Sequence, residues 1–351
     1  MNKGINITTI DRPWTTESGA TFSSVDIAWK SWGTLNKQRD NVILICHALT
    51  GHAAADEWFS GLFAKNGILD PETQFIICIN APGSCYGSTG PKSINPETGK
   101  PYKGDFPEIT IRDIVHFQQL LLDHLDIESI ELVIGGSMGG MNALEFTLID
   151  ERVQSAALLA MGKSHSPWAI GISQAQRRAI YADPNWKNGF YDDEHPPEAG
   201  LAAAREMAMI TYRTPQNYDQ KFGRDVHPEK DIFQVESYLD YQGEKLVKRF
   251  DANAYVVLSK AMDYHDVSRA RGSFEEVLGS VQQAVLIVGI ESDLLYPINE
   301  QIELAELIPN STFAPIKSPY GHDAFLIEFE QINGHLKQFY KTHTQKISTQ
   351  L

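Results

Sequence analysis

Short apolar runs recur along the chain and alternate with stretches of helical periodicity. Nearly continuous runs of β-branched and aliphatic residues are typical of strands that are buried on both faces of a sheet. Such runs cover residues 42–46, 75–80, 130–134 and 284–289. The run at 156–161 is interpreted as a further core strand, although its periodicity leaves a helix open.

The segments around these runs have other periods. Residues 113–126 place apolar side chains on one helical face, and Thr110 or Asp113 is expected to cap that helix. Residues 1–40 are polar, with alternating stretches such as 25–30, which predicts antiparallel edge strands. The alternation of strand and helix predicts an α/β fold with a mostly parallel sheet and helices on both faces.

This alternation stops at about residue 162 and resumes at about residue 280. The stretch between them contains no convincing core strand. Its patterns predict helices at residues 173–181, 198–211 and 252–262. After the insertion the expected elements are a strand, a helix at 297–307, a short strand at 312–314 and a final helix. We therefore predict a core domain formed by residues 1–162 and 280–351, and an inserted helical lid formed by residues 163–279.

Composition narrows the class of protein. The chain has 351 residues, of which 42% are hydrophobic and 21% charged, and its formal net charge of -15 argues against nucleic acid or anionic membranes as partners. No apolar run approaches the length of a membrane span, and no signal region follows Met1, so a cytoplasmic enzyme is expected. The cysteines Cys46, Cys78 and Cys85 fit neither a disulfide framework nor a zinc site.

The sharpest local signal lies where the run at 130–134 ends. The sequence Gly-Gly-Ser-Met-Gly-Gly at 135–140 follows an expected strand and precedes an expected helix. A G-x-S-x-G pattern in that context is typical of the nucleophile elbow of α/β-hydrolases, where the serine occupies a strained turn and the glycines avoid collisions. A plain connector or a phosphate-binding loop is the alternative. We predict that Ser137 is a nucleophile.

Two further candidates follow later strands. Asp293 comes after the run at 284–289, and His322 comes after the last expected strand. Catalytic groups of open α/β sheets gather at the carboxyl ends of strands, and the order Ser, Asp, His is that of α/β-hydrolase triads. Taken singly, Asp293 could be a helix cap and His322 a structural histidine. Together with the elbow they predict a triad, with His322 as general base and Asp293 holding the imidazole.

A serine nucleophile needs an oxyanion hole. The amide of Met138, directly after the nucleophile, is one expected donor. The loop 47–51 after an earlier strand is expected to supply the other, for which we favour the Leu49 amide. His47 and His52 lie in or beside this loop, but no third ligand completes a metal site. We expect neither a bound metal nor a tightly bound cofactor.

Several stretches together resemble the homoserine O-acyltransferases of the α/β-hydrolase fold, and among them the homoserine O-acetyltransferases. The resemblance extends from about residue 20 to about residue 330. The matching residues are 47–51, 83, 87–91, 106–107, 135–141, 176–177, 210–213, 235–239, 249–253, 261–263, 292–293 and 321–323. The resemblance implies a hydrolase core with a helical lid and a homodimer.

The resemblance also implies a ping-pong reaction in methionine biosynthesis. Ser137 would attack the thioester of acetyl-CoA, and the side-chain hydroxyl of L-homoserine would then attack the acyl-enzyme. Arg213 would pair with the acceptor carboxylate and Asp323 with its ammonium group. The alternatives are a structural ion pair for Arg213 and a solvated carboxylate for Asp323. Arg177 is either a tunnel or coenzyme A contact or a charge on the lid surface.

Other functions stay open at this point. Succinyl-CoA as donor, or serine as acceptor, would use the same scaffold, since one methylene is worth only about 1–3 kcal/mol of discrimination. A serine esterase would use water as acceptor, and a binding protein would need no triad. Two departures from the family pattern bear on this choice: His52, where the family often has an acidic residue or serine, and the segment 191–197, which matches no pattern that we can place.

Overall fold

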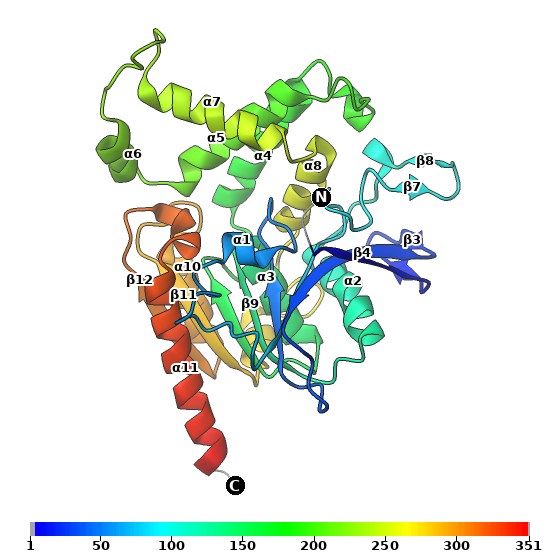
Figure 1. Ribbon diagram of the computed structural model, residues 1–351, viewed down its shortest axis with the longest axis vertical. Coiled ribbons are helices and arrows are strands. Elements are labelled where there is room, and N and C mark those ends of the chain that lie inside the picture. Colours follow the sequence, from blue (N-terminus) through cyan, green and yellow to red (C-terminus); the bar gives the residue numbers. More distant parts are fainter. Residues whose placement is uncertain (1–3, 350–351) are drawn as a thin grey trace.

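A sheet of eight strands forms the centre of the molecule (Figure 1). The structure, a computed structural model, describes residues 4–349, with side chains described through Thr342. The β1–β4 and β4–β6 pairs are antiparallel, and the other neighbours pair in parallel. In sheet order the strands are β1 (Asn6–Ile10), β4 (Val25–Trp32), β6 (Phe75–Ile79), β5 (Val42–Cys46), β9 (Ile130–Gly136), β10 (Ser155–Leu159), β11 (Ala284–Ile290) and β12 (Ser311–Ile316). The predicted mostly parallel sheet is confirmed, and the run after residue 155 is a strand, not a helix.

Both faces of the sheet are covered, which explains the continuous apolar runs. Every side chain of β5 is buried, and alternate residues belong to different halves of the core. Leu44 packs in the half that includes α2 (Ile111–His124) and α3 (Met138–Ile149). Ile43 and Ile45 pack in the half that includes α11 (Phe329–Thr349). A strand between two such layers has no side that needs polar residues.

Helix α2 begins with a reciprocal cap. Thr110 Oγ1 accepts from the Asp113 N–H at 3.2 Å, and Asp113 Oδ2 accepts from the Thr110 N–H at 2.9 Å. The two residues considered as caps therefore share the role, in a capping box. The smaller elements of the core are β2 (Trp14–Thr15), β3 (Thr21–Phe22), α1 (Ala55–Trp58), β7 (Ile94–Asn95), β8 (Lys100–Pro101), η1 (Lys103–Asp105), α10 (Ile298–Leu307) and η3 (Gly321–Leu326).

Between β10 and β11 the chain leaves the sheet and forms helices, and those of them that are labelled in Figure 1 gather at one end of the sheet. These are α4 (Pro167–Ala182), η2 (Lys187–Gly189), α5 (Glu198–Tyr212), α6 (Pro215–Phe222), α7 (Gln234–Val247), α8 (Ala252–Asp263) and α9 (Phe274–Gly279). Helices α4, α5 and α8 include the three predicted helical segments, whereas α6 and α7 were not predicted individually. The exact division of the chain into two domains stays a prediction.

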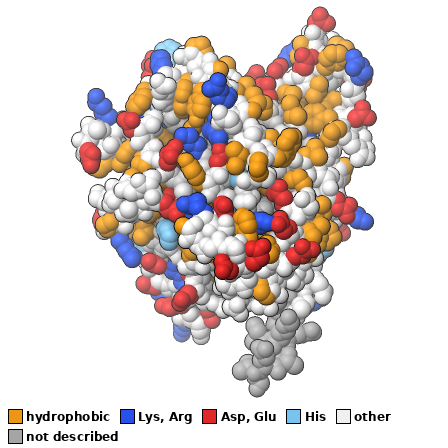
Figure 2. Space-filling model, turned by 180° about the vertical axis from the view of Figure 1, so that it is seen from behind, with side chains coloured by type: hydrophobic (Ala, Val, Ile, Leu, Met, Phe, Trp, Pro, Cys, Tyr) orange, Lys and Arg blue, Asp and Glu red, His pale blue; other side chains and the backbone are white. Residues whose placement is uncertain are grey.

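Large hydrophobic side chains are exposed on the lid. Ile210, Val226, Phe233 and Tyr241 are each at least 40% exposed. Figure 2 shows hydrophobic side chains gathered at the upper right, on the part of the molecule that carries the lid helices.

Within residues 4–349 no helix combines the length and the apolar character that crossing a membrane requires. The homodimer and the cytoplasmic location stay predictions.

The turn between β9 and α3 is strained and tightly packed. Ser137 has φ 57° and ψ -126°, values that persist in a residue with a side chain only where the surroundings enforce them. A Cβ atom on Gly139 would lie 2.1 Å from the carbonyl oxygen of Cys46, and one on Gly135 would lie 2.2 Å from the carbonyl oxygen of Gly139. Helix α3 thus approaches β5 and β9 more closely than any side chain permits.

Replacing Gly139 by alanine is expected to lower the free energy of unfolding by at least about 2 kcal/mol, because the added methyl group must push α3 away from β5. Urea denaturation measures this change. The matched control is Gly171→Ala in α4, where nothing lies within 4 Å of an added Cβ. There the gain in helix propensity should raise stability by about 0.5–1 kcal/mol. Equal effects of the two substitutions would contradict the close packing at the elbow.

Candidate active site

The three residues predicted as a triad meet at the carboxyl ends of parallel strands. Ser137 follows β9, Asp293 follows β11, and His322 lies in η3, after β12. Each of the three is at most 7% exposed. His322 Nδ1 donates to Asp293 Oδ2 at 2.7 Å, and Ser137 lines the same cavity as His322. An imidazole held in this way, beside a serine, can act as a general base for serine attack.

The carboxylate of Asp293 is fixed by the backbone as well as by the histidine. Its Oδ1 accepts from the N–H groups of Leu295 at 2.8 Å and Tyr296 at 3.0 Å. One side chain thus has two functions: Asp293 Oδ1 caps the turn before α10, and Asp293 Oδ2 holds His322. The imidazole is enclosed by the rings of Tyr212 and Tyr296, whose centroids lie 5.5 and 5.3 Å from its own. The orientation of His322 is thus set on several sides.

The cavity beside Ser137 has a volume of about 200 Å³. The core contributes the loop 48–52 and part of η3, and the lid contributes Arg205, Tyr212 and Arg249. A ligand in this cavity therefore contacts both parts of the chain. Drug-sized ligands occupy pockets of about 300–1,000 Å³, so this space suits an acyl group and a small acceptor, while a large carrier must extend outside it.

The two predicted oxyanion donors belong to elements that border Ser137. Met138 is the first residue of α3, where an N–H group has no partner within the helix. Leu49 lines the cavity. The carbonyl oxygen of Ala48 accepts from the Gly51 N–H at 2.8 Å and from His47 Nδ1 at 2.9 Å. Because a trans peptide unit is planar, fixing this carbonyl also fixes the opposite direction of the Leu49 N–H.

His47 supports this loop from inside the core and is 1% exposed. Its Nε2 accepts from the Ala81 N–H at 2.9 Å, so the ring proton is on Nδ1 and donates to Ala48. Burial lowers the pKa of His47 to about 4, which keeps the ring neutral. Both ring nitrogens are used within the fold. Among the described residues no group of three or more His, Cys, Asp or Glu side chains could hold a metal ion.

Arg213 and Asp323, predicted to bind the acceptor, form an ion pair with each other. Arg213 Nε lies 2.8 Å from Asp323 Oδ2. Asp323 lines the cavity of Ser137, whereas Arg213 is not among the residues that line it. Burial raises the pKa of Asp323, although the charge of Arg213 opposes this shift. Arg213 is thus placed to act on a ligand through Asp323, and its predicted direct contact with a carboxylate stays a prediction.

Sequence reasoning assigned no role to two arginines of this cavity, Arg205 and Arg249. Arg205 lies seven residues before Tyr212, so both project from one face of α5, a helical spacing that could have drawn attention to it. Within the described residues the Arg205 guanidinium lies 5.7 Å from the centroid of the Tyr212 ring and forms no ion pair, although its charge acts to lower the pKa of Asp323. Arg177, by contrast, is buried and pairs with Asp263 of α8, so its charge serves the lid itself.

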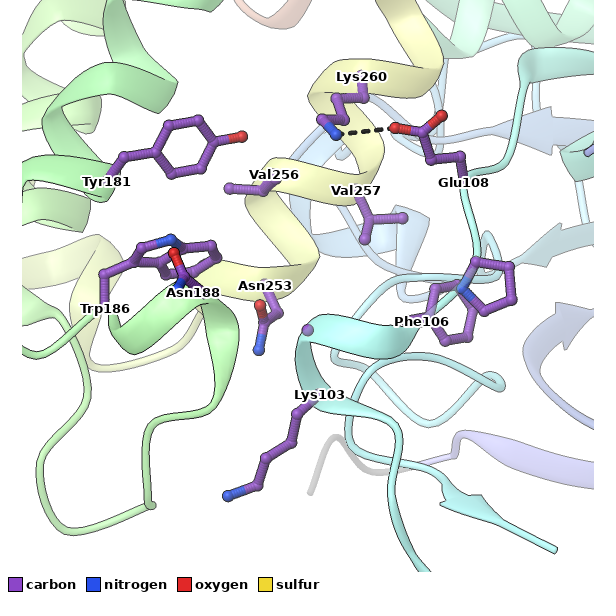
Figure 3. Close-up of a pocket in the computed structure, with 12 residues that line it drawn as sticks. Lys103, Phe106, Glu108, Tyr181, Trp186, Asn188, Asn253, Val256, Val257 and Lys260 are labelled. Atoms are coloured by element: carbon purple, nitrogen blue, oxygen red, sulfur yellow. Dashed lines mark hydrogen bonds and ion pairs between the residues drawn. The ribbon is translucent and has the colours of Figure 1, made fainter. Parts of the chain in front are cut away.

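A larger cavity, of about 440 Å³, lies between the segment 103–108 and helices α4 and α8 (Figure 3). Figure 3 shows Tyr181 and Trp186 on one side of it and, across from them, Lys260 joined to Glu108. The Lys260 Nζ to Glu108 Oε1 distance is 2.8 Å. Among the residues that the structure describes, no serine, histidine or cysteine lines this cavity. Although this cavity is larger than the one beside Ser137, the described residues of its lining offer no serine, cysteine or histidine for nucleophilic catalysis.

Comparison with known proteins agrees with this geometry. Residues 41–329 match the family model of the alpha/beta hydrolase fold. A curated relative from Chlorobium chlorochromatii (strain CaD3), named homoserine O-acetyltransferase, is 52% identical over 335 residues, which cover 94% of each chain. The chain belongs to the homoserine O-acetyltransferase family. The resemblance found in the motifs is thereby confirmed.

Solved structures place this homoserine O-acetyltransferase family member among both transferases and esterases. The crystal structure of homoserine O-acetyltransferase from Bacillus anthracis is similar with a TM-score of 0.87 and 27% identity, covering 97% of this chain and 98% of that one. Esterase E22 is similar with a TM-score of 0.85 and 25% identity, covering 95% and 99%. The same fold thus occurs under both names, so the fold alone does not determine the acceptor.

Acid is expected to weaken the fold through His47. Its pKa is about 4 in the folded protein and about 6.5 in an unfolded chain, so the unfolded chain binds the proton first as the pH falls. The stability that depends on neutral His47 is complete above about pH 6.5 and is lost towards pH 4, by roughly 2–3 kcal/mol at about pH 4.5.

A His47→Gln variant isolates this contribution, because glutamine does not titrate. The difference in the free energy of unfolding between the unsubstituted protein and the variant should shrink by roughly 2–3 kcal/mol from neutral pH to about pH 4.5. Urea titrations at a series of pH values measure it. A difference that stays constant across this range would contradict the buried neutral histidine.

Proposed function

We propose that the chain transfers the acetyl group of acetyl-CoA to the side-chain hydroxyl of L-homoserine through an acyl-Ser137 intermediate. The observation that carries the proposal is the content of one cavity. Ser137 and His322 lie there together with Asp323 and Arg205, groups of opposite charge that suit the ammonium and carboxylate of an amino acid. The name of the relatives from this family supports the transfer of an acetyl group to homoserine.

In the first half-reaction Ser137 Oγ attacks the thioester carbonyl while His322 takes its proton. The Asp293 carboxylate, 2.7 Å from His322 Nδ1, stabilises the imidazolium that forms. The Met138 and Leu49 amides would stabilise the oxyanion of the tetrahedral intermediate. When this intermediate collapses, the carbon–sulfur bond breaks and the thiolate of coenzyme A leaves with the proton from His322.

In the second half-reaction the acceptor hydroxyl replaces the thiol. His322 takes the hydroxyl proton, the oxygen attacks the acyl carbon, and the proton returns to Ser137 as the new ester leaves. Asp323 would accept from the acceptor ammonium, with Arg213 holding its other side. Arg205 would pair with the carboxylate, because it lines the cavity and forms no ion pair within the described residues.

The alternatives are distinguished by the acceptor and the donor. An esterase would need only the triad and water, and would have no use for Asp323 and Arg205 beside the serine. Transfer requires that water be kept from the acyl-enzyme, and Ser137 is only 7% exposed beneath the lid. Serine as acceptor and succinyl-CoA as donor are not favoured by the names of the relatives. Acetylation of homoserine is also the reaction in methionine biosynthesis that the family resemblance implied.

Thiol release from acetyl-CoA and succinyl-CoA, each with homoserine, serine or no acceptor, tests the proposal. We expect acetyl-CoA with homoserine to be fastest, and release without acceptor to stop after one acyl group per Ser137. Ser137→Ala should abolish the acyl adduct in the mass spectrum and lower turnover by about 10⁴-fold or more. Equally fast release without any acceptor would contradict transfer, and near-normal turnover of the alanine variant would contradict the nucleophile.

Arg205→Gln is expected to raise KM for homoserine by about 10- to 100-fold, since a hydrogen bond to a charged group contributes about 1.5–3 kcal/mol. The rate of acyl-enzyme formation from acetyl-CoA should change little, because the acetyl group carries no charge. The matched control is Arg178→Gln, at an exposed position of α4, with unchanged constants. A rise in KM for acetyl-CoA alone would contradict the assignment of Arg205 to the acceptor.

A further inference from the structure

Arg249 joins the lid to the loop that carries the proposed Leu49 oxyanion donor. It follows the last residue of α7 by two positions. Its Nη1 donates to the carbonyl oxygen of Thr50 at 2.8 Å and to the Tyr86 hydroxyl at 2.7 Å. Its Nη2 lies 3.4 Å from Thr50 Oγ1. One guanidinium thus holds both the backbone and the side chain of Thr50, from a residue 199 positions away.

Tyr86, whose hydroxyl also accepts from Arg249, is itself held in place by the core. The Tyr86 ring packs against His52 and Phe250, with centroid distances of 5.2 and 5.7 Å. The backbone carbonyl of Tyr86 accepts from the side-chain amide of Asn80 at 2.6 Å. Arg249 therefore connects Thr50 to an anchored part of the core, and it does so with the planar fork that a lysine lacks.

Thr50 is the next residue after Leu49, and the loop is held at two points. On the side of Ala48 the restraint comes from His47 and the Gly51 N–H. On the side of Thr50 the restraint comes from Arg249. An oxyanion donor works only when its N–H lies within about 2.7–3.1 Å of the developing charge. Release of either restraint would allow the Leu49 N–H to leave this range.

We propose that Arg249 is a positioning residue for acyl transfer: by clamping Thr50 from the lid, it keeps the Leu49 amide aimed at the oxyanion. The inference rests on the proposed function, because it presupposes a tetrahedral intermediate on Ser137. It also assigns a role to the packing of the lid against the core, since the oxyanion hole is complete only when the end of α7 lies against the loop 47–51.

Arg249 could instead bind the carrier of the acyl group. It is exposed, lines the cavity of Ser137, and has no carboxylate partner among the described residues. A guanidinium in this place could pair with a phosphate of coenzyme A. The two roles differ in one respect: a phosphate contact matters only for donors that carry phosphate, whereas the position of the Leu49 amide matters for every acyl donor.

The test compares acylation by acetyl-CoA with acylation by p-nitrophenyl acetate, which carries no phosphate, in Arg249→Ala and Arg249→Lys. We expect the alanine variant to lose about 10- to 100-fold with both donors, less than the loss of an oxyanion donor itself. The inhibition constant of free coenzyme A should change less than about twofold, and added guanidinium should restore part of the rate. A lysine at this position can contact one oxygen, but not Thr50 and Tyr86 together. The acylation rate of the lysine variant should therefore lie between those of the alanine variant and the unsubstituted protein.

The matched control is Lys248→Ala, whose side chain is exposed and pairs with Glu244 of the same helix at 4.0 Å, and which should leave all rates unchanged. A loss confined to acetyl-CoA, with weaker binding of coenzyme A, would overturn the proposal in favour of a phosphate contact. Unchanged rates with both donors would also overturn it. If the alanine variant melts at a lower temperature, the test rests on the lysine variant and on the rescue by guanidinium. An intermediate rate of the lysine variant and a restored rate with guanidinium would then support the clamp, and the absence of both would overturn it.

The same measurements separate this proposal from the proposed function. If the unsubstituted protein is acylated by p-nitrophenyl acetate but not by acetyl-CoA, the proposed function fails. The effect of Arg249→Ala on acylation by the ester still measures the clamp on Thr50 in that case. A rate with the ester that does not depend on Arg249 would refute the clamp even if acetyl-CoA proves to be the donor.

Discussion

The close approach of α3 to the ends of β5 and β9 is the constraint on which the site depends. Because Gly139 lies against the carbonyl of Cys46, the first turn of α3 and the loop 47–51 are neighbours. This proximity is what would allow the Met138 and Leu49 amides to form the proposed oxyanion hole beside Ser137. A strained backbone of the kind found at Ser137 costs about 1–3 kcal/mol, and the buried layers on both faces of the sheet offset it.

The two acidic side chains of the site, Asp293 and Asp323, use their two carboxylate oxygens differently. Asp293 uses Oδ1 for the turn before α10 and Oδ2 for His322, so one carboxylate orders both the loop and the base. Asp323 places Oδ2 against Arg213, which leaves Oδ1 for a ligand. Buried carboxylates are costly unless they are paired. Both charges are compensated within the protein, and Oδ1 of Asp323 would be left for the proposed ligand.

The lid changes what the core can do. The core supplies the proposed nucleophile, base and oxyanion amides, which would be sufficient for acyl chemistry with any acceptor. The lid adds Arg205 and Tyr212 from α5 and Arg249 from the end of α7. These residues would select a charged acceptor and hold the loop 47–51 in place. An esterase with the same fold is consistent with this division, because the acceptor is decided by a few side chains around a common centre.

Much of the site was readable from the sequence alone. The strands of a parallel sheet end at one edge, so the positions of Ser137, Asp293 and His322 after successive apolar runs were enough to expect them together, and local rules were enough for the cap of α2. The pairing of Arg213 with Asp323 was decided only by the tertiary structure, and the proposed roles of Arg205 and Arg249 rest on it as well. They depend on how helices of the insertion pack against loops far away along the chain, and such contacts leave no periodic trace in the residues that make them.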